Sequence, residues 1–190
     1  YIPVSIGIVL LMQTVWMGVL LEMFLDKKWP SPTKSFAVFI VLMGTALATN
    51  IIRNEIQLDW RGIMWGLLAA ASFTATMFTS NRVALEISIS QRSLFMLLGG
   101  AVVVFSFVLA TQNTVFNLEI FMKWGIILAL FGTIIPPLLL NAGLPDTGIG
   151  LGSIVASLEL PVSVMMAYFL LNENVNMTQW IGIGLIILAI

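Results

Sequence analysis

Residues 148–171 read GIGLGSIVASLELPVSVMMAYFLL, an apolar run that contains one carboxylate, Glu159, and one proline, Pro161. A helix of about 20 apolar residues crosses the hydrocarbon core of a bilayer, and this run is long enough to do so. Glu159 lies halfway along it, near the expected membrane centre. Because a charge there costs about 2.5–3.5 kcal/mol on insertion scales, Glu159 must be protonated, paired or facing a wet cavity. The stretch therefore predicts a membrane span with an unusual carboxyl group at its midpoint.

The composition of the chain indicates the same surroundings. Of its 190 residues, 59% are hydrophobic and 9% are charged, whereas soluble domains carry about 25% charged residues. The charged stretches separate seven apolar segments, which are residues 2–25, 36–52, 62–81, 93–111, 124–144, 148–171 and 179–190. We therefore predict an all-α polytopic membrane protein with seven helices.

Basic residues are unevenly divided between alternate loops. One set of loops holds Lys27, Lys28, Lys34, Arg82 and Arg92, and the other holds Arg53, Arg61 and Lys123. Since Lys and Arg accumulate in cytoplasmic loops, the first set is expected in the cytoplasm.

The chain aligns with itself at an offset of 145 positions, the separation of Val19 and Val164 and of Phe24 and Phe169. Such identities arise either from a true repeat or from biased composition. A true repeat would begin its second copy near Trp60, and the first copy would extend about three spans ahead of Tyr1. Each unit would then hold five helices, and an odd number of spans inverts the second unit. The predicted division is 1–59, the end of the first repeat, and 60–190, the whole second repeat.

The residue types present exclude most catalytic chemistry. The chain has no cysteine and no histidine, which removes thiolate chemistry, the commonest metal ligand and the commonest general base. Its aspartates fall in loops and its lysines at span ends, so no intramembrane protease arrangement is available. A net charge of −1 provides no basic field for nucleic acid. We predict a protein that is not an enzyme and has no cofactor, metal or nucleic-acid partner.

Glu159 is the leading candidate site residue, as a proton carrier or as the partner of a substrate amine. A structural hydrogen bond to a neighbouring helix is the alternative. Pro161 lacks an N–H, so the carbonyl of Ser157 loses its helical partner and a kink is predicted beside Glu159. Pro136 and Pro137 repeat this device, although a kink that serves only helix packing explains them equally well.

Other polar residues accompany these in the spans. Gln13 and Trp16 are three residues apart, which places an amide beside an aromatic ring on one helix face. Asn141 follows the two prolines by about one turn, and Ser163 shares the face of Glu159. The predicted substrate-binding or proton-coupling residues are Glu159, Gln13, Trp16, Asn141 and Ser163, and the predicted hinges are Pro161, Pro136 and Pro137. The neighbouring small residues Gly44 and Ala48 are predicted to form a helix-packing surface.

Residues 148–189, 9–48 and 60–82 together resemble the EamA-like ten-helix members of the drug/metabolite transporter superfamily. The first range is similar to the last two helices of that family, with the sequence ELPV at its centre. The resemblance implies inverted five-helix repeats with both termini in the cytoplasm, of which this chain lacks about the first three helices. It also implies export of small metabolites through a central cavity by alternating access. It does not choose among amino acids, nucleosides, polyamines and drugs.

The predicted partners are accordingly a small-molecule substrate, the lipid bilayer and a second copy of the chain in a homodimer. The expected location is the bacterial cytoplasmic (inner) membrane. The alternative function is a membrane adaptor or receptor that does not transport.

Overall fold

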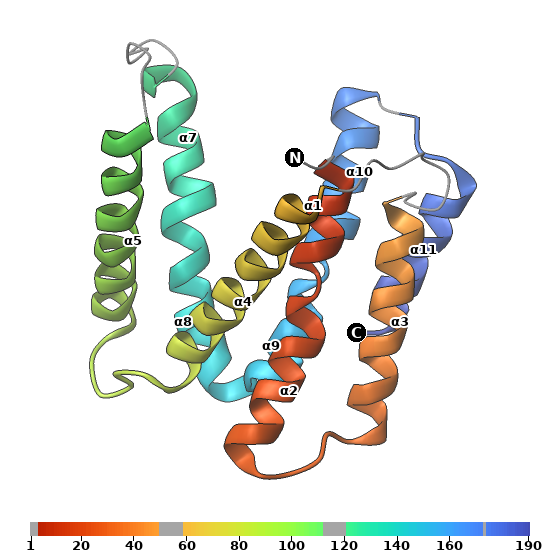
Figure 1. Cartoon of the computed structure of the whole chain (residues 1–190), viewed down its shortest axis with the longest axis horizontal. Helices are drawn as coiled ribbons and strands as arrows, with labels where there is room; N and C mark the ends of the chain where they lie inside the picture. The colour runs from red at the N-terminus through yellow and green to blue at the C-terminus, as the bar shows by residue number, and fades with distance from the viewer. Residues whose placement is uncertain (1–3, 50–58, 112–120, 173) are drawn as a thin grey trace. The chain divides into compact units, whose positions relative to one another are not determined.

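The computed structural model describes residues 4–49, 59–111, 121–172 and 174–190, and this part of the chain is helical without strands (Figure 1). The elements are α1 (Val4–Leu11), α2 (Thr14–Asp26), α3 (Pro32–Ala48), α4 (Trp60–Arg82), α5 (Ile89–Thr111), η1 (Phe121–Gly125), α7 (Ile126–Leu128), η2 (Ala129–Ile134), α8 (Ile135–Thr147), α9 (Ile149–Ala156), α10 (Glu159–Leu171) and α11 (Met177–Leu188). The predicted all-α fold is confirmed.

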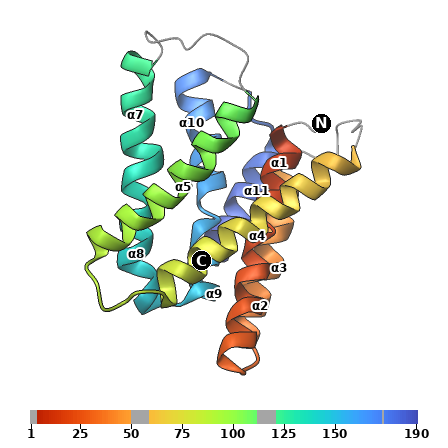
Figure 2. The same cartoon turned by 60° about the vertical axis from the view of Figure 1, so that its left-hand side comes forward.

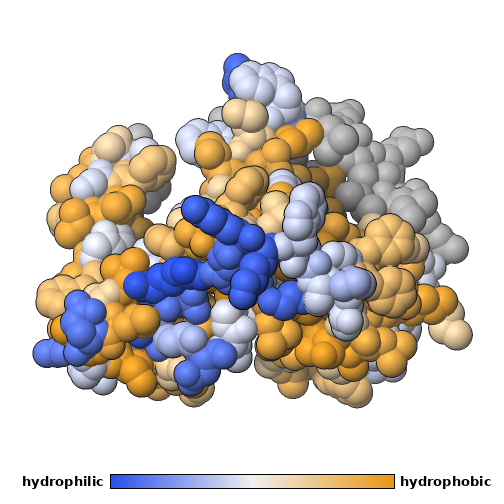
Figure 3. Space-filling view, turned by 90° about the horizontal axis from the view of Figure 1, so that it is seen from below, coloured by the Kyte–Doolittle hydropathy of each residue, from blue (hydrophilic) through white to orange (hydrophobic). Residues whose placement is uncertain are grey.

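Helices long and apolar enough to cross a membrane account for most of these elements. The five candidate spans are Ile6–Asp26, Trp60–Arg82, Ile89–Thr111, Ile126–Thr147 and Ile149–Leu170, and two shorter apolar helices are Pro32–Ala48 and Met177–Leu188. Each of the seven predicted segments is thus represented by a helix, and residues 2–3 and 50–52 of these segments, together with Arg53, lie outside the described residues. Figure 3 shows patches of hydrophilic side chains beside hydrophobic surface.

The chain divides into two compact units. The first contains Tyr1–Phe78 and Thr147–Ile190, and the second contains Thr79–Asp146.

In the first unit, α3 and α11 cross at two glycines. A methyl group built on Gly44 would lie 2.8 Å from the carbonyl oxygen of Gly182, so the two backbones are in direct contact. Gly44 also faces Ile186, whereas Ala48, one turn later on α3, faces Gly182 and accepts a hydrogen bond from Gln179. Because the contacts move forward along α3 and backward along α11, the two helices run in opposite directions.

Helix α2 packs against α9 in the same antiparallel manner. The hydroxyl of Ser153 donates to the carbonyl of Val15 at 3.1 Å. Gly18 lies against both Ser153 and the carbonyl of Ile149, and Val19 reaches Gly150. Small residues let these helices approach closely, which is how helices associate inside membranes.

Two of the spans are broken, and the breaks are equivalent. Residues 12–13 separate α1 from α2, and residues 157–158 separate α9 from α10. At both breaks two corresponding backbone N–H groups bond three residues back instead of four, at 3.1 or 3.2 Å. The bonds are Gln13 to Leu10 and Val15 to Met12 in the first span, and Leu158 to Val155 and Leu160 to Ser157 in the second. Each bond of one break is offset from its counterpart by 145 positions (Met12 to Ser157). The second break has one more such bond, from Ser157 to Ile154, whereas Met12 bonds four residues back to Ile8.

The same offset relates the ends of the broken spans. The residue that follows α2 is Lys27 and the residue that follows α10 is Asn172, and both adopt the left-handed conformation, with φ of 54° and 53°. The next helix is then capped by Ser31 in α3 and by Asn176 in α11, whose side chains accept from the backbone N–H three residues later. α3 and α11 are therefore corresponding helices, and since they run antiparallel the predicted inverted repeat is confirmed for this part of the fold.

The reason given for the kink at Pro161 needs correction. The carbonyl of Ser157 has a partner, because it accepts from the N–H of Leu160 at 3.2 Å. The equivalent carbonyl of Met12 accepts from Val15 although the position matching Pro161 is Trp16. The break thus occurs in both repeats, with or without a proline, and Pro161 is compatible with it.

Pro136 and Pro137 lie at the start of α8, immediately after the π-helical segment η2. The carbonyls that they were expected to free, those of Gly132 and Thr133, fall inside η2. Both prolines and π-turns are sites where helices change direction. The hinge role of Pro136 and Pro137 stays a prediction.

Candidate functional site

Glu159 is the first residue of α10, directly after the break, and its side chain is exposed. The next two residues, Leu160 and Pro161, are buried in the core of the first unit. Glu159 therefore points away from that core.

Ser163 lies one turn beyond Glu159 and is also exposed. It lines a pocket of about 280 Å³ formed by α10, the ends of α1 and α3 and the start of α11. Thr49, Asn174 and Gln179 contribute further polar groups to this pocket. The arrangement offers hydroxyl and amide groups rather than charges.

Gln13 and Trp16 lie at the equivalent break in the other repeat and bond to each other. The Nε1–H of Trp16 donates to Oε1 of Gln13 at 2.7 Å, and Nε2 of Gln13 donates to the carbonyl of Val9 at 3.0 Å. The amide thereby bridges the two sides of the break. Trp16 also lines an almost wholly apolar pocket of about 490 Å³ between α2 and α4.

Asn141 belongs to the second unit, where it joins a buried polar cluster formed by Ser80, Asn81, Arg92, Ser93 and Asn141. Its Nδ2 donates to Oγ of Ser93 at 2.9 Å. Its Oδ1 is buried and has no hydrogen-bond partner within the described residues. The role predicted for Asn141 in substrate binding stays a prediction.

Arg92 is the residue of this cluster that the sequence analysis assigned to a loop. Its side chain is only 6% exposed, and its guanidinium donates to the carbonyls of Ser80 and Asn141. The missed signal is the capping box of Ser88 and Gln91, a serine followed three residues later by a glutamine, which starts a helix before Arg92.

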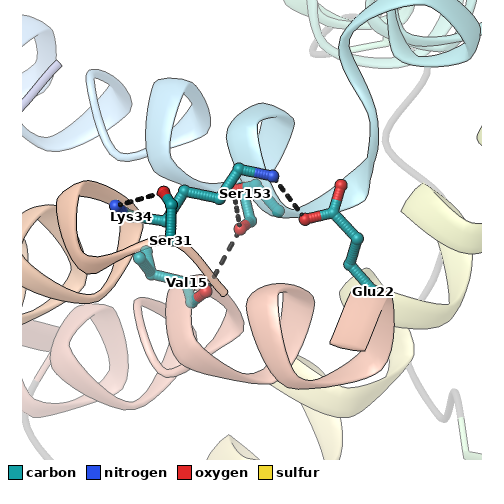
Figure 4. Close-up of polar contacts among 6 residues, drawn as sticks. Val15, Glu22, Ser31, Lys34 and Ser153 are labelled. Atoms are coloured by element: carbon teal, nitrogen blue, oxygen red, sulfur yellow. Dashed lines mark hydrogen bonds and ion pairs between the residues drawn. The ribbon is translucent and has the colours of Figure 1, made fainter. Parts of the chain in front are cut away.

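A second contact missed from the sequence is the ion pair between Glu22 and Lys34. Their Oε2 and Nζ atoms are 2.6 Å apart, and the pair joins α2 to α3 (Figure 4). Figure 4 also shows Lys34 bonded to its cap residue Ser31. The two charges are 12 positions apart, a spacing that no helix periodicity brings together.

Broken apolar spans, antiparallel corresponding helices and polar groups at both breaks define a multi-pass membrane protein with an inverted repeat. The sequence model of the EamA-like transporter family matches residues 60–190, more than half of the chain. The chain therefore belongs to the EamA-like transporter family and is an integral membrane protein of the drug/metabolite transporter type. Searches of curated proteins and of solved structures gave no match.

Proposed function

We propose that this protein exports small metabolites by alternating access through a central cavity between its two inverted repeats. The observation that carries the proposal is the pair of equivalent breaks in oppositely directed spans. Transporters built from inverted repeats bind their substrates near the membrane midplane at the repeat interface, and the two breaks lie at corresponding positions of the two repeats. The proposed division places residues 1–59 in the first repeat and 60–190 in the second.

Glu159 and Gln13 supply the chemistry at the breaks. Glu159 offers an exposed carboxylate that can accept a proton or pair with a substrate amine. Gln13 retains one amide N–H beyond its bond to Val9, with the ring of Trp16 beside it. Ser163 extends the polar surface one turn from Glu159, and Asn141 is proposed as a further substrate contact.

The proposed setting is the bacterial inner membrane, with a small-molecule substrate, the surrounding lipid and a second copy of the chain as partners. The proposal treats the protein as a transporter without catalytic activity. A membrane adaptor or receptor is the alternative, and a stoichiometric partner recovered in mild detergent together with absent solute flux would favour it.

Glu159→Gln is expected to lower solute flux by about tenfold, equivalent to about 1.4 kcal/mol, and to remove the pH dependence of the remaining flux. The change keeps the size of the side chain but removes its ability to carry a proton or a charge. Flux is measured in proteoliposomes with labelled amino acids, nucleosides and polyamines, over a range of pH.

Glu86→Gln is the matched control, because Glu86 is an exposed carboxylate in the turn between α4 and α5. It should transport as the wild type does. Normal flux in the Glu159→Gln protein at every pH would show that Glu159 is structural, and flux no greater than in empty vesicles for the wild type would overturn the transporter proposal.

A further inference from the structure

The Glu22–Lys34 ion pair joins α2 to α3 at one end of the first unit. α2 and α3 form a hairpin that turns at this end (Figure 1, Figure 2), and the pair spans the two helices just inside the turn. Both charged groups are partly shielded, with side-chain exposures of 17% for Glu22 and 32% for Lys34. An ion pair in such a position is screened less by salt than one in open water.

The carboxylate of Glu22 also packs against a third helix, α9. A methyl group built on Gly148, at the N-terminal end of α9, would lie 2.6 Å from Oε1 of Glu22. Gly150 faces the other carboxylate oxygen in the same way. The left-handed φ of 81° at Gly148 also favours glycine. One side chain thus holds α2, α3 and the start of α9 together.

A pocket of about 220 Å³ lies at this ion pair, and the Ser163 pocket is its equivalent under the repeat. Five lining positions of the two pockets correspond at the offset of 145. They are Val19 and Val164, Glu22 and Ala167, Trp29 and Asn174, Pro30 and Val175, and Lys34 and Gln179. Each of the two repeats therefore forms a recess at the same position of its fold.

The two recesses differ in charge. Ala167 and Gln179 replace the acid and the base of the ion pair, and Gln179 bonds instead to the carbonyl of Ala48 at 3.2 Å. Exposure differs at the shared valine as well, because Val19 is buried and Val164 is only half-buried. Val19 is covered by the hydrophobic cluster that also contains Val15, Val41 and Ile154. The presence of the ion pair is therefore what distinguishes the first recess from the second.

We propose that the Glu22–Lys34 ion pair is a latch that keeps one entrance of the transport path closed, and that the equivalent recess at Val164, where Ala167 and Gln179 replace the two charges, has no such latch. The inference rests on the proposed transport function, since it assigns these residues the control of access to that path. Opening the latched end requires the ion pair to separate and the Glu22 carboxylate to leave the glycines of α9. Removing either charge should raise the population of molecules open at that end.

The natural absence of cysteine allows a direct test. Val19→Cys and Val164→Cys place one thiol at the same position of each recess, in the intact protein solubilised in mild detergent. The rate of modification by a hydrophilic maleimide is measured by mass shift. We expect Lys34→Gln, which installs the residue used by the other repeat, to speed modification at position 19 by about tenfold and to leave position 164 unchanged or slower.

Lys28→Gln is the control, because Lys28 lines the same recess but makes no ion pair with any described residue. It should leave both rates unchanged, and Lys34→Arg, which keeps the charge, should behave as the wild type. Equal rates at position 19 in the wild type and the Lys34→Gln protein would overturn the latch. An equal rise at both positions would indicate general loosening and would also overturn it. Because the assay needs no substrate, a failure of solute flux with normal latch behaviour would count against the transport function alone.

Discussion

Replacing Gly182 by alanine is expected to lower the free energy of unfolding by about 3 kcal/mol. A methyl group at this position would lie 2.5 Å from the carbonyl oxygen of Gly44 and 2.9 Å from Cα of Ala48. These are backbone atoms of α3 that no rotamer change can move away. The helices must separate, which removes contacts along the whole α3–α11 crossing, including the fully buried Ile186.

The thermal melting temperature of the detergent-solubilised protein checks this prediction. Gly184→Ala is the matched control, because it adds the same methyl group to the same helix at a position with no heavy atom within 4 Å. We expect Gly182→Ala to melt several degrees below the wild type and Gly184→Ala to melt within about one degree of it. Equal melting of the two variants would show that the helices are not in backbone contact at Gly182.

The α3–α11 crossing also shows how far the sequence alone could go. Span positions were predictable because hydrophobicity over about 20 residues is a strong signal in a membrane protein. Gly44 and Ala48 were recognised as a packing surface. Their partner, Gly182, was not, because small residues lie on many faces of these spans and only the three-dimensional crossing selects one of them.

Prolines were a poorer guide to the breaks than the repeat itself. Pro161 marks one break, but the equivalent break at Gln13 has no proline. The internal offset of 145 would have located it, since it places Gln13 opposite Leu158. A repeated backbone hydrogen-bond pattern leaves little trace in residue identity, because N–H groups and carbonyls are common to all residues except proline.

Contacts between charged side chains and their partners were the part of the structure that the sequence predicted least well. Lys34 and Arg92 were both expected in loops. Both expectations follow from the low frequency of charges inside membranes. The structure instead satisfies Glu22 with Lys34, and Arg92 with two carbonyls. Such pairings depend on the turn between helices and on the packing of distant elements.

Arg92→Gln is expected to destabilise the protein by about 3 kcal/mol or more, because it removes two hydrogen bonds from a charged donor to buried carbonyls. The guanidinium reaches Ser80 near the end of α4 and Asn141 in α8 from a single position on α5. Glutamine is shorter and has one amide group, so it cannot donate to the carbonyls of both Ser80 and Asn141. The cluster would also lose its only formal charge, which the carbonyl end of α4 favours.

Melting temperature again provides the measurement, and two further variants separate charge from geometry. Arg92→Lys keeps the charge but loses the planar fork that addresses two carbonyls, so it should recover only part of the lost stability. Arg61→Gln removes an exposed arginine that lies over the ring of Trp60 at 5.9 Å, and it should change stability by less than about 0.5 kcal/mol. If Arg92→Gln melted together with Arg61→Gln, the buried guanidinium would not be what joins α4, α5 and α8. A full recovery by lysine would instead assign the stability to charge alone, without the paired contacts to Ser80 and Asn141.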